Sequence, residues 1–130
     1  YANARLKEDE ASRILTEREE LVQQQKIFLD PEITIDKLAT MINSNRHFVS
    51  QVLNERAGQS FYDYINQYRV NEAKRLLLDP EYSNQKIASI AYDAGFNSLS
   101  AFNDVFKKVT GTTPSQFKKD EQPVSRQQRG

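Results

Sequence analysis

One pattern occurs twice in the sequence, and it constrains the fold more than any other feature. Leu38 and Ala39 of the first copy correspond to Ile90 and Ala91 of the second, 52 residues later. The second copy then has one extra residue, so the spacing becomes 53 residues. At this spacing the corresponding pairs are Val49 and Phe102, Gln51 and Asp104, Val52 and Val105, Leu53 and Phe106, and Gly58 and Gly111. A pattern repeated in this way predicts two similar structural units.

Each copy predicts a helix, a sharp corner and a second helix. Ala39 and Ala91 are small residues, which suit a place where two helices approach closely. Four residues after each alanine the chain must reverse, and Asn43 and Gly95 stand at these two positions. Glycine adopts a positive φ freely, and asparagine tolerates it better than most other residues. We therefore expect one helix–turn–helix unit to occur twice.

Apolar residues at helical spacing predict helices along the whole chain, and no strand pattern competes with them. Capping and breaking residues set the expected bounds. The expected elements are a polar leading helix ended by Asp30-Pro31, a helix from Ile35 capped by Thr34, a helix over 45–56, a long linker helix opened by Ser60 and closed by Asp79-Pro80, a helix over 85–94 capped by Asn84, a helix over 98–109, and a short helix beginning at Pro114. Tyr62, Tyr64 and Tyr68 are expected to pack in the core or along the linker.

The expected fold class is all-α, with two helix–turn–helix subdomains joined by a long linker helix and preceded by an extra N-terminal helix. We expect residues 1–30 to form the leading helix, which would connect to an upstream region that is not in this chain. Residues 31–119 would form the double unit and residues 120–130 a flexible tail. Within the double unit, the first subdomain is expected over 31–59, the linker over 60–79 and the second subdomain over 83–119.

In each unit the second helix is held by its apolar side, which leaves the other side free. A helix held in this way fits the major groove of B-DNA, which is about 12 Å wide. A linker of about 18 residues would be roughly 27 Å long. Successive major grooves on one side of the duplex are about 34 Å apart. The pattern therefore predicts one chain that can read two adjacent grooves.

The net charge of the chain is zero, so charge gives no overall attraction to nucleic acid. The charge is unevenly distributed, since residues 83–119 contain five lysines and two aspartates. Ordinary surface lysines explain this excess equally well. With no cysteine and no apolar run of about 20 residues, a cytosolic domain is expected, although the full-length protein could be anchored to a membrane.

Nothing in the sequence indicates catalysis or a cofactor. His47 is the single histidine, and no cysteine is present to complete a metal site with it. No Gly-rich phosphate loop occurs, and Glu19 and Glu20 point to different faces of a helix. We therefore expect no enzyme, no cofactor and no metal.

The chain resembles the DNA-binding domain of AraC/XylS-type transcription regulators. The segment "IASIAYDAGFNSLSAFNDVFKKVTGTTPSQFKK" carries most of the resemblance, and "IDKLATMINSNRHFVSQVLNERAGQSFYDYINQYRVNEAKRLLLD" carries the rest. The leading helix and the junction "FLDPEITIDKLA" are also similar to regulators in which this domain follows a membrane-embedded or repeat-containing sensor. The resemblance implies double-stranded DNA as the partner and leaves open a homodimer and a contact with RNA polymerase.

The resemblance also implies which exposed residues contact DNA. In the first copy these are Arg46, His47, Ser50, Gln51 and Asn54, and in the second copy they are Ser98, Leu99, Ser100, Asn103, Asp104 and Lys107, with Lys108 beside them. Arg46 could pair with guanine and Gln51 with adenine.

Asp104 departs from the family pattern, because members often carry arginine or another donor at this position. A carboxylate repels phosphate but can accept a hydrogen bond from the amino group of cytosine, and Leu99 can contact only a thymine methyl group. The second copy is therefore expected either to bind weakly or to bind mainly through phosphate contacts. Candidates for these contacts are Lys107, Lys108 and the backbone N–H groups at Thr34, Gln85 and Ser98.

A helical protein-interaction module is the alternative from another functional class. The neutral net charge and the tyrosine-rich linker favour it. Retention on a DNA or heparin column would distinguish the two.

Overall fold

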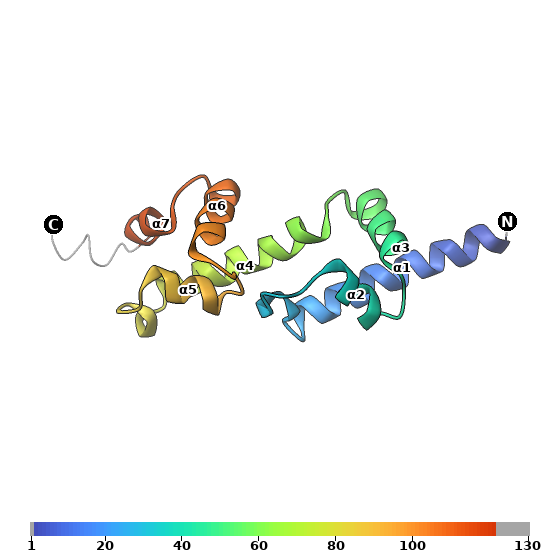
Figure 1. Ribbon diagram of the computed structural model, residues 1–130. Helices are drawn as coiled ribbons and strands as arrows, with labels where there is room; N and C mark the ends of the chain where they lie inside the picture. Colours follow the sequence, from blue (N-terminus) through green and yellow to red (C-terminus); the bar gives the residue numbers. More distant parts are fainter. Residues whose placement is uncertain (1, 122–130) are drawn as a thin grey trace. The chain divides into compact units, whose positions relative to one another are not determined.

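The computed structural model describes residues 2–121, with side chains from residue 4 onward, and all regular secondary structure in this part of the chain is helical (Figure 1). The expected tail over 120–130 lies outside the described residues from residue 122 on. The helices are α1 (Ala2–Gln23), α2 (Ile35–Met41), α3 (Arg46–Val52), α4 (Phe61–Leu78), α5 (Ile87–Asp93), α6 (Leu99–Thr110) and α7 (Pro114–Asp120). Short 3₁₀ turns cover Ile27–Leu29 and Pro80–Tyr82, and a π-helical turn covers Leu53–Ala57 directly after α3.

The chain forms two compact units, and α4 begins in one and ends in the other. The first unit comprises the chain up to Phe28 together with Glu32–Ile65, and the second comprises Leu29–Pro31 and the chain from Asn66 onward. The short segment Leu29–Pro31 belongs to the second unit, where Arg69 Nη2 donates a hydrogen bond of 2.9 Å to the Asp30 carbonyl oxygen.

In the first unit, α1 supplies part of the core. Ala11, Ile14 and Val22 of this helix are all buried. The other buried side chains of this unit come from α2, α3, the residues directly after each of them and the start of α4, namely Leu38, Ala39, Ile42, Val49, Val52, Leu53, Phe61 and Ile65. The Arg18 guanidinium also lies 3.7 Å from the centre of the Tyr64 ring, a distance suited to a cation–π contact. The leading helix is therefore an integral part of the first helix–turn–helix unit.

In the second unit, α4, α5 and α6 enclose a core that is rich in phenylalanine. Phe102 and Phe106 are fully buried, and their ring centres are 5.5 Å apart in an edge-to-face arrangement. Phe96 and Phe117 extend the row on either side, at 5.1 and 5.5 Å. Burial of one such ring contributes roughly 1.5–3 kcal/mol, so this row fixes one side of α6 firmly.

Both expected corners are confirmed. Asn43 has a φ of 58° and Gly95 a φ of 99°, so both copies reverse through a positive φ. Ala39 and Ala91 are 3% and 0% exposed, as expected where helices approach closely. Thr34, Ser60 and Ser98 each accept a hydrogen bond from a backbone N–H three residues later, and Pro114 is the first residue of α7.

Two expected bounds are wrong. The leading helix ends at Gln23 rather than at Asp30-Pro31, because the chain turns at Lys26, with a φ of 53°, to bury Ile27 and Phe28. The helix expected over 45–56 is confirmed, since the chain is α-helical from Arg46 to Val52 and continues as the π-helical turn to Ala57.

The helix expected from Gln85 begins at Ile87, and Asn84 does not cap it. Lys86 stands at the cap position and makes no side-chain capping bond. The Gln85 N–H is already donated to the Tyr82 carbonyl oxygen at 3.0 Å, so this residue belongs to the preceding turn.

Within residues 2–121, none of the helices combines the length and the apolar character that crossing a membrane requires.

We predict that Asn43→Ala lowers the free energy of unfolding by about 1 kcal/mol, because a Cβ-bearing residue without a polar side chain is strained at a φ of 58°. Asn43→Gly should leave stability unchanged or raise it, and Gly95→Ala should destabilise the second unit by about 1–2 kcal/mol. Urea unfolding measures the free energy of unfolding of the three variants and of the native chain. Equal stability of Asn43→Ala and Asn43→Gly would contradict the role given to the corner.

Candidate nucleic-acid interface

The free side of α3 is polar and exposed. The helix is held by Val49 and Val52, both buried. At 100° per residue, the side opposite these residues carries His47, Gln51 and Asn54, and all three are exposed. Of the five expected contact residues of the first copy, the other two, Arg46 and Ser50, lie at one edge of this surface rather than at its centre. The surface formed by Arg46, His47, Ser50, Gln51 and Asn54 is called the first reading surface below.

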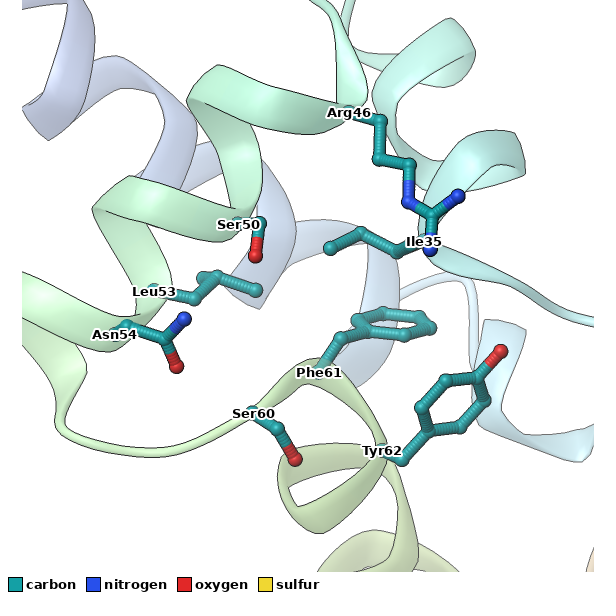
Figure 2. A pocket seen from close by; sticks show the side chains of 8 residues that line it. All are labelled: Ile35, Arg46, Ser50, Leu53, Asn54, Ser60, Phe61 and Tyr62. Atoms are coloured by element: carbon teal, nitrogen blue, oxygen red, sulfur yellow. The ribbon is translucent and has the colours of Figure 1, made fainter.

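The edge with Arg46 borders a cavity of about 170 Å³ (Figure 2). The cavity is lined by Ile35, Arg46, Ser50, Leu53, Asn54, Ser60, Phe61 and Tyr62. Arg46 Nη1 lies 3.8 Å from Asp36 Oδ2, and both side chains are about two-thirds exposed. An exposed ion pair at this distance contributes little, so the Arg46 guanidinium can exchange Asp36 for another partner.

Tyr62 is a residue of this edge that the sequence did not single out. We expected it to pack in the core or along the linker, but its side chain is 50% exposed and lines the cavity beside Arg46. Tyr64, by contrast, is 7% exposed and packs as expected. One sequence feature could have indicated the exposure of Tyr62. It lies in the first turn of α4, two residues after the capping residue Ser60 and directly after the buried Phe61.

Beyond Gln51, the first reading surface borders α1. A second cavity, of about 180 Å³, is lined there by Lys7, Ala11, Phe48, Gln51, Val52, Glu55 and Arg56. The Gln51 side-chain amide nitrogen lies 3.4 Å from both carboxylate oxygens of Glu55. Such long, exposed contacts are weak, so the amide can turn to a new partner at little cost.

The start of α3 is set by Asn45. Its side-chain oxygen accepts a hydrogen bond of 2.9 Å from the Phe48 N–H, which satisfies one of the free donors at the helix N-terminus. Arg46 and His47 therefore occupy the first turn, the part of a recognition helix that comes nearest to base edges.

In the second unit the free side of α6 has mixed charge. Phe102 and Phe106 point into the core, and the opposite side carries Ser100, Asp104 and Lys107. These three residues are exposed, as are Leu99, Asn103 and Lys108. Within the part of the chain that the structure describes, Asp104, Lys107 and Lys108 have no ion-pair partner. The surface formed by Leu99, Ser100, Asn103, Asp104, Lys107 and Lys108 is called the second reading surface below.

Ser98 lies at the start of α6 and is committed to the helix. Its hydroxyl oxygen accepts a hydrogen bond of 3.1 Å from the Ala101 N–H, and the side chain is half-buried. Of the backbone N–H groups expected to bind phosphate, that of Gln85 is unsuitable, because it is donated to the Tyr82 carbonyl oxygen. Thr34 and Ser98 do precede helices directly.

Neither reading surface has the composition of a metal centre. Among the described residues, no three His, Cys, Asp or Glu side chains come together closely enough to hold a metal ion. The side chains available are suited to hydrogen bonding with bases and to ion pairing with phosphate.

Comparison with known proteins gives a consistent result. A family model described as a helix-turn-helix domain matches residues 38–120. An uncharacterized HTH-type transcriptional regulator of Staphylococcus aureus (strain COL) is 28% identical over 97 residues, which are 75% of this chain and 13% of that protein. The chain thus spans about an eighth of the length of this relative.

Solved structures with the same fold include DNA-binding domains. The C-terminal domain of AraT, a response regulator from Geobacillus stearothermophilus, is 25% identical with a TM-score of 0.72, covering 84% of this chain and 85% of that one. The DNA-binding domain of AdpA, a global transcriptional factor solved in complex with a target DNA, has a TM-score of 0.70 at 19% identity, covering 87% and 96%.

We predict that Ser98→Ala lowers the free energy of unfolding of the second unit by about 1 kcal/mol, because the Ala101 N–H loses its partner. Ser98→Asp should retain stability, since aspartate also caps helices. Ser100→Ala, an exposed serine of the same turn, is the control and should change stability by less than about 0.5 kcal/mol. Thermal unfolding measures the stability of all three variants. Unchanged stability of Ser98→Ala would show that this cap does not stabilise the second unit.

Proposed function

The chain belongs to the AraC-type helix-turn-helix family of transcription regulators, and we propose that it binds a specific sequence of double-stranded DNA through α3 and α6 placed in successive major grooves. The observation that carries this proposal is the repetition of one geometry. In both units a positive-φ corner precedes a helix whose apolar side is buried and whose polar side is exposed.

The linker supports the use of both units on one duplex. α4 is a continuous helix of 18 residues, which corresponds to a length of about 27 Å. This length is comparable with the spacing of about 34 Å between successive major grooves on one side of B-DNA.

We propose that the first reading surface supplies most of the base recognition. His47, Gln51 and Asn54 would face the base edges, and Gln51 can pair with adenine through its amide. Arg46 would reach guanine from the edge of the surface, exchanging its weak contact with Asp36.

The second reading surface would contribute mainly phosphate contacts. Lys107 and Lys108 are exposed and have no ion-pair partner among the described residues, so they can neutralise phosphate without breaking a contact. Asp104 would be tolerated opposite the amino group of a cytosine, and Leu99, 39% exposed, opposite a thymine methyl group.

The wider role of the protein is proposed on the same basis. We propose that an upstream sensor region controls this domain, that the domain acts in the cytoplasm by binding and not by catalysis, and that RNA polymerase and a second copy of the chain are its further partners.

We predict that Arg46→Ala and Gln51→Ala each reduce discrimination between a selected site and a scrambled duplex, by about 1–3 kcal/mol per lost base contact. Lys107→Ala should weaken binding to both duplexes about equally. It should also reduce the slope of log affinity against log salt concentration by about one, the value for one lost phosphate contact. Fluorescence anisotropy titrations at several salt concentrations measure both quantities. Unchanged discrimination in Arg46→Ala would remove the role proposed for this residue.

The native chain should also be retained on a column carrying duplex DNA and released by salt. A native chain that passes through at low salt and binds no duplex from a random pool would overturn the proposed function and favour a protein-interaction module.

A further inference from the structure

The π-helical turn that continues α3 is held by a charged residue of α1. Arg56, in this turn, donates two hydrogen bonds to the two carboxylate oxygens of Glu8, one of 2.7 Å from Nη1 and a second from Nη2. Two parallel hydrogen bonds fix the relative orientation of the two groups as well as their distance. The Arg56 guanidinium also holds the pKa of the Glu8 carboxyl below its ordinary value, so the pair remains charged at neutral pH.

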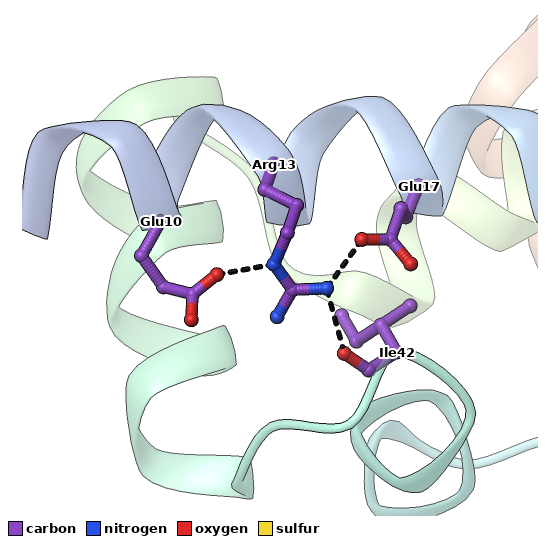
Figure 3. Close-up of polar contacts among 4 residues, drawn as sticks. All are labelled: Glu10, Arg13, Glu17 and Ile42. Atoms are coloured by element: carbon purple, nitrogen blue, oxygen red, sulfur yellow. Dashed lines mark hydrogen bonds and ion pairs between the residues drawn. The ribbon is translucent and has the colours of Figure 1, made fainter. Parts of the chain in front are cut away.

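The corner before α3 is held by the same helix (Figure 3). Arg13 Nη1 donates a hydrogen bond of 2.9 Å to the Ile42 carbonyl oxygen, at the C-terminal end of α2. This carbonyl is one of the unsatisfied acceptors that every helix C-terminus leaves, so a guanidinium is a suitable partner. The Arg13 guanidinium also donates hydrogen bonds to the carboxylates of Glu10 and Glu17, which flank it and raise its pKa.

These contacts lie on either side of the first reading surface. One holds the chain just before α3 and the other just after it, while Val49 and Val52 hold the helix along its length. Neither Glu8 nor Arg13 belongs to the reading surface itself. Together the two contacts restrict rotation of α3 about its own axis, which is the motion that would misplace His47, Gln51 and Asn54.

We infer that α1 positions the first reading surface for DNA, with Glu8 and Arg13 as its positioning residues. The inference rests on the proposed function. The alternative, that these contacts only stabilise the fold, fits the Glu8–Arg56 pair poorly. Its side chains are 61% and 37% exposed, and exposed pairs add little to stability. The buried side chains of α1 already attach this helix to the unit.

The sign of the effect on binding distinguishes positioning from simple electrostatics. Glu8 is an acidic residue in the unit that is proposed to meet DNA. On charge alone, its neutralisation strengthens binding to any duplex. If Glu8 positions α3, its neutralisation instead weakens binding to the specific site.

The experiment compares Glu8→Gln with Asp9→Asn in the full chain. Asp9 is the neighbouring carboxylate on α1, is exposed and has no ion-pair partner among the described residues, so both variants lose one negative charge at nearly the same place. We expect Glu8→Gln to reduce affinity for a selected duplex about three- to tenfold, with binding to a scrambled duplex not reduced. Asp9→Asn should reduce neither.

A charge exchange gives a second readout. In the Glu8→Arg, Arg56→Glu double variant the net charge is unchanged and the pair can form in the opposite direction. We expect each single reversal to lower specific affinity and the double variant to recover most of it. The dependence of binding on salt should remain that of the native chain, because Glu8 contacts no phosphate. Thermal unfolding of every variant confirms that the folded chain is being compared.

The outcomes separate the inference from the function on which it rests. If folded Glu8→Gln binds the selected duplex as tightly as Asp9→Asn does, or if the double variant recovers nothing, the inference is wrong while the native chain still binds specifically. If the native chain itself does not distinguish the selected from the scrambled duplex, it is the proposed function that fails.

Discussion

The reversal of the chain through a positive φ is the constraint on which both units depend. At Asn43 and Gly95 the backbone turns within a few residues, and the helix that follows packs against the helix before it. Ala39 and Ala91, both buried, leave room for that approach. Because packing within each unit buries the apolar side of α3 and of α6, their polar sides remain exposed. A surface that could read DNA is thus a consequence of how the corner is built.

The two units use this shared geometry with different chemistry. α6 is anchored by large rings and carries two exposed lysines, Lys107 and Lys108, on its free side. α3 is anchored by smaller aliphatic side chains, and α1 contacts the chain shortly before and shortly after it. Polar contacts with α1 therefore flank the free helix of the first unit, whereas aromatic packing holds the free helix of the second. This difference agrees with the proposed division between base recognition in the first unit and phosphate contact in the second.

Local sequence features predicted most of the fold. The corners, the caps at Thr34, Ser60 and Ser98, and the buried sides of the helices follow from residue type and spacing alone. The end of α1 and the start of α5 did not follow, because each depends on a turn whose hydrogen bonds or burial involve residues outside the helix.

The site was predicted less completely than the fold. The candidate contact residues on α3 and α6 came from the resemblance to AraC/XylS-type regulators, and helical spacing places most of them on the side opposite the buried residues. The Glu8–Arg56 pair joins residues 48 positions apart in the sequence, and no periodic pattern predicts such a contact. Tyr62 was misplaced for a similar reason, since its exposure depends on where the start of α4 lies within the unit.

The central claim is that two units of one chain read one duplex through a linker of fixed length. The most direct measurement is the affinity for a selected site before and after insertion of about five base pairs, half a helical turn, between its two halves. The account predicts that affinity falls to that of a site with one half scrambled, because α6 then meets the opposite side of the duplex. An affinity that is unchanged by the insertion would contradict it.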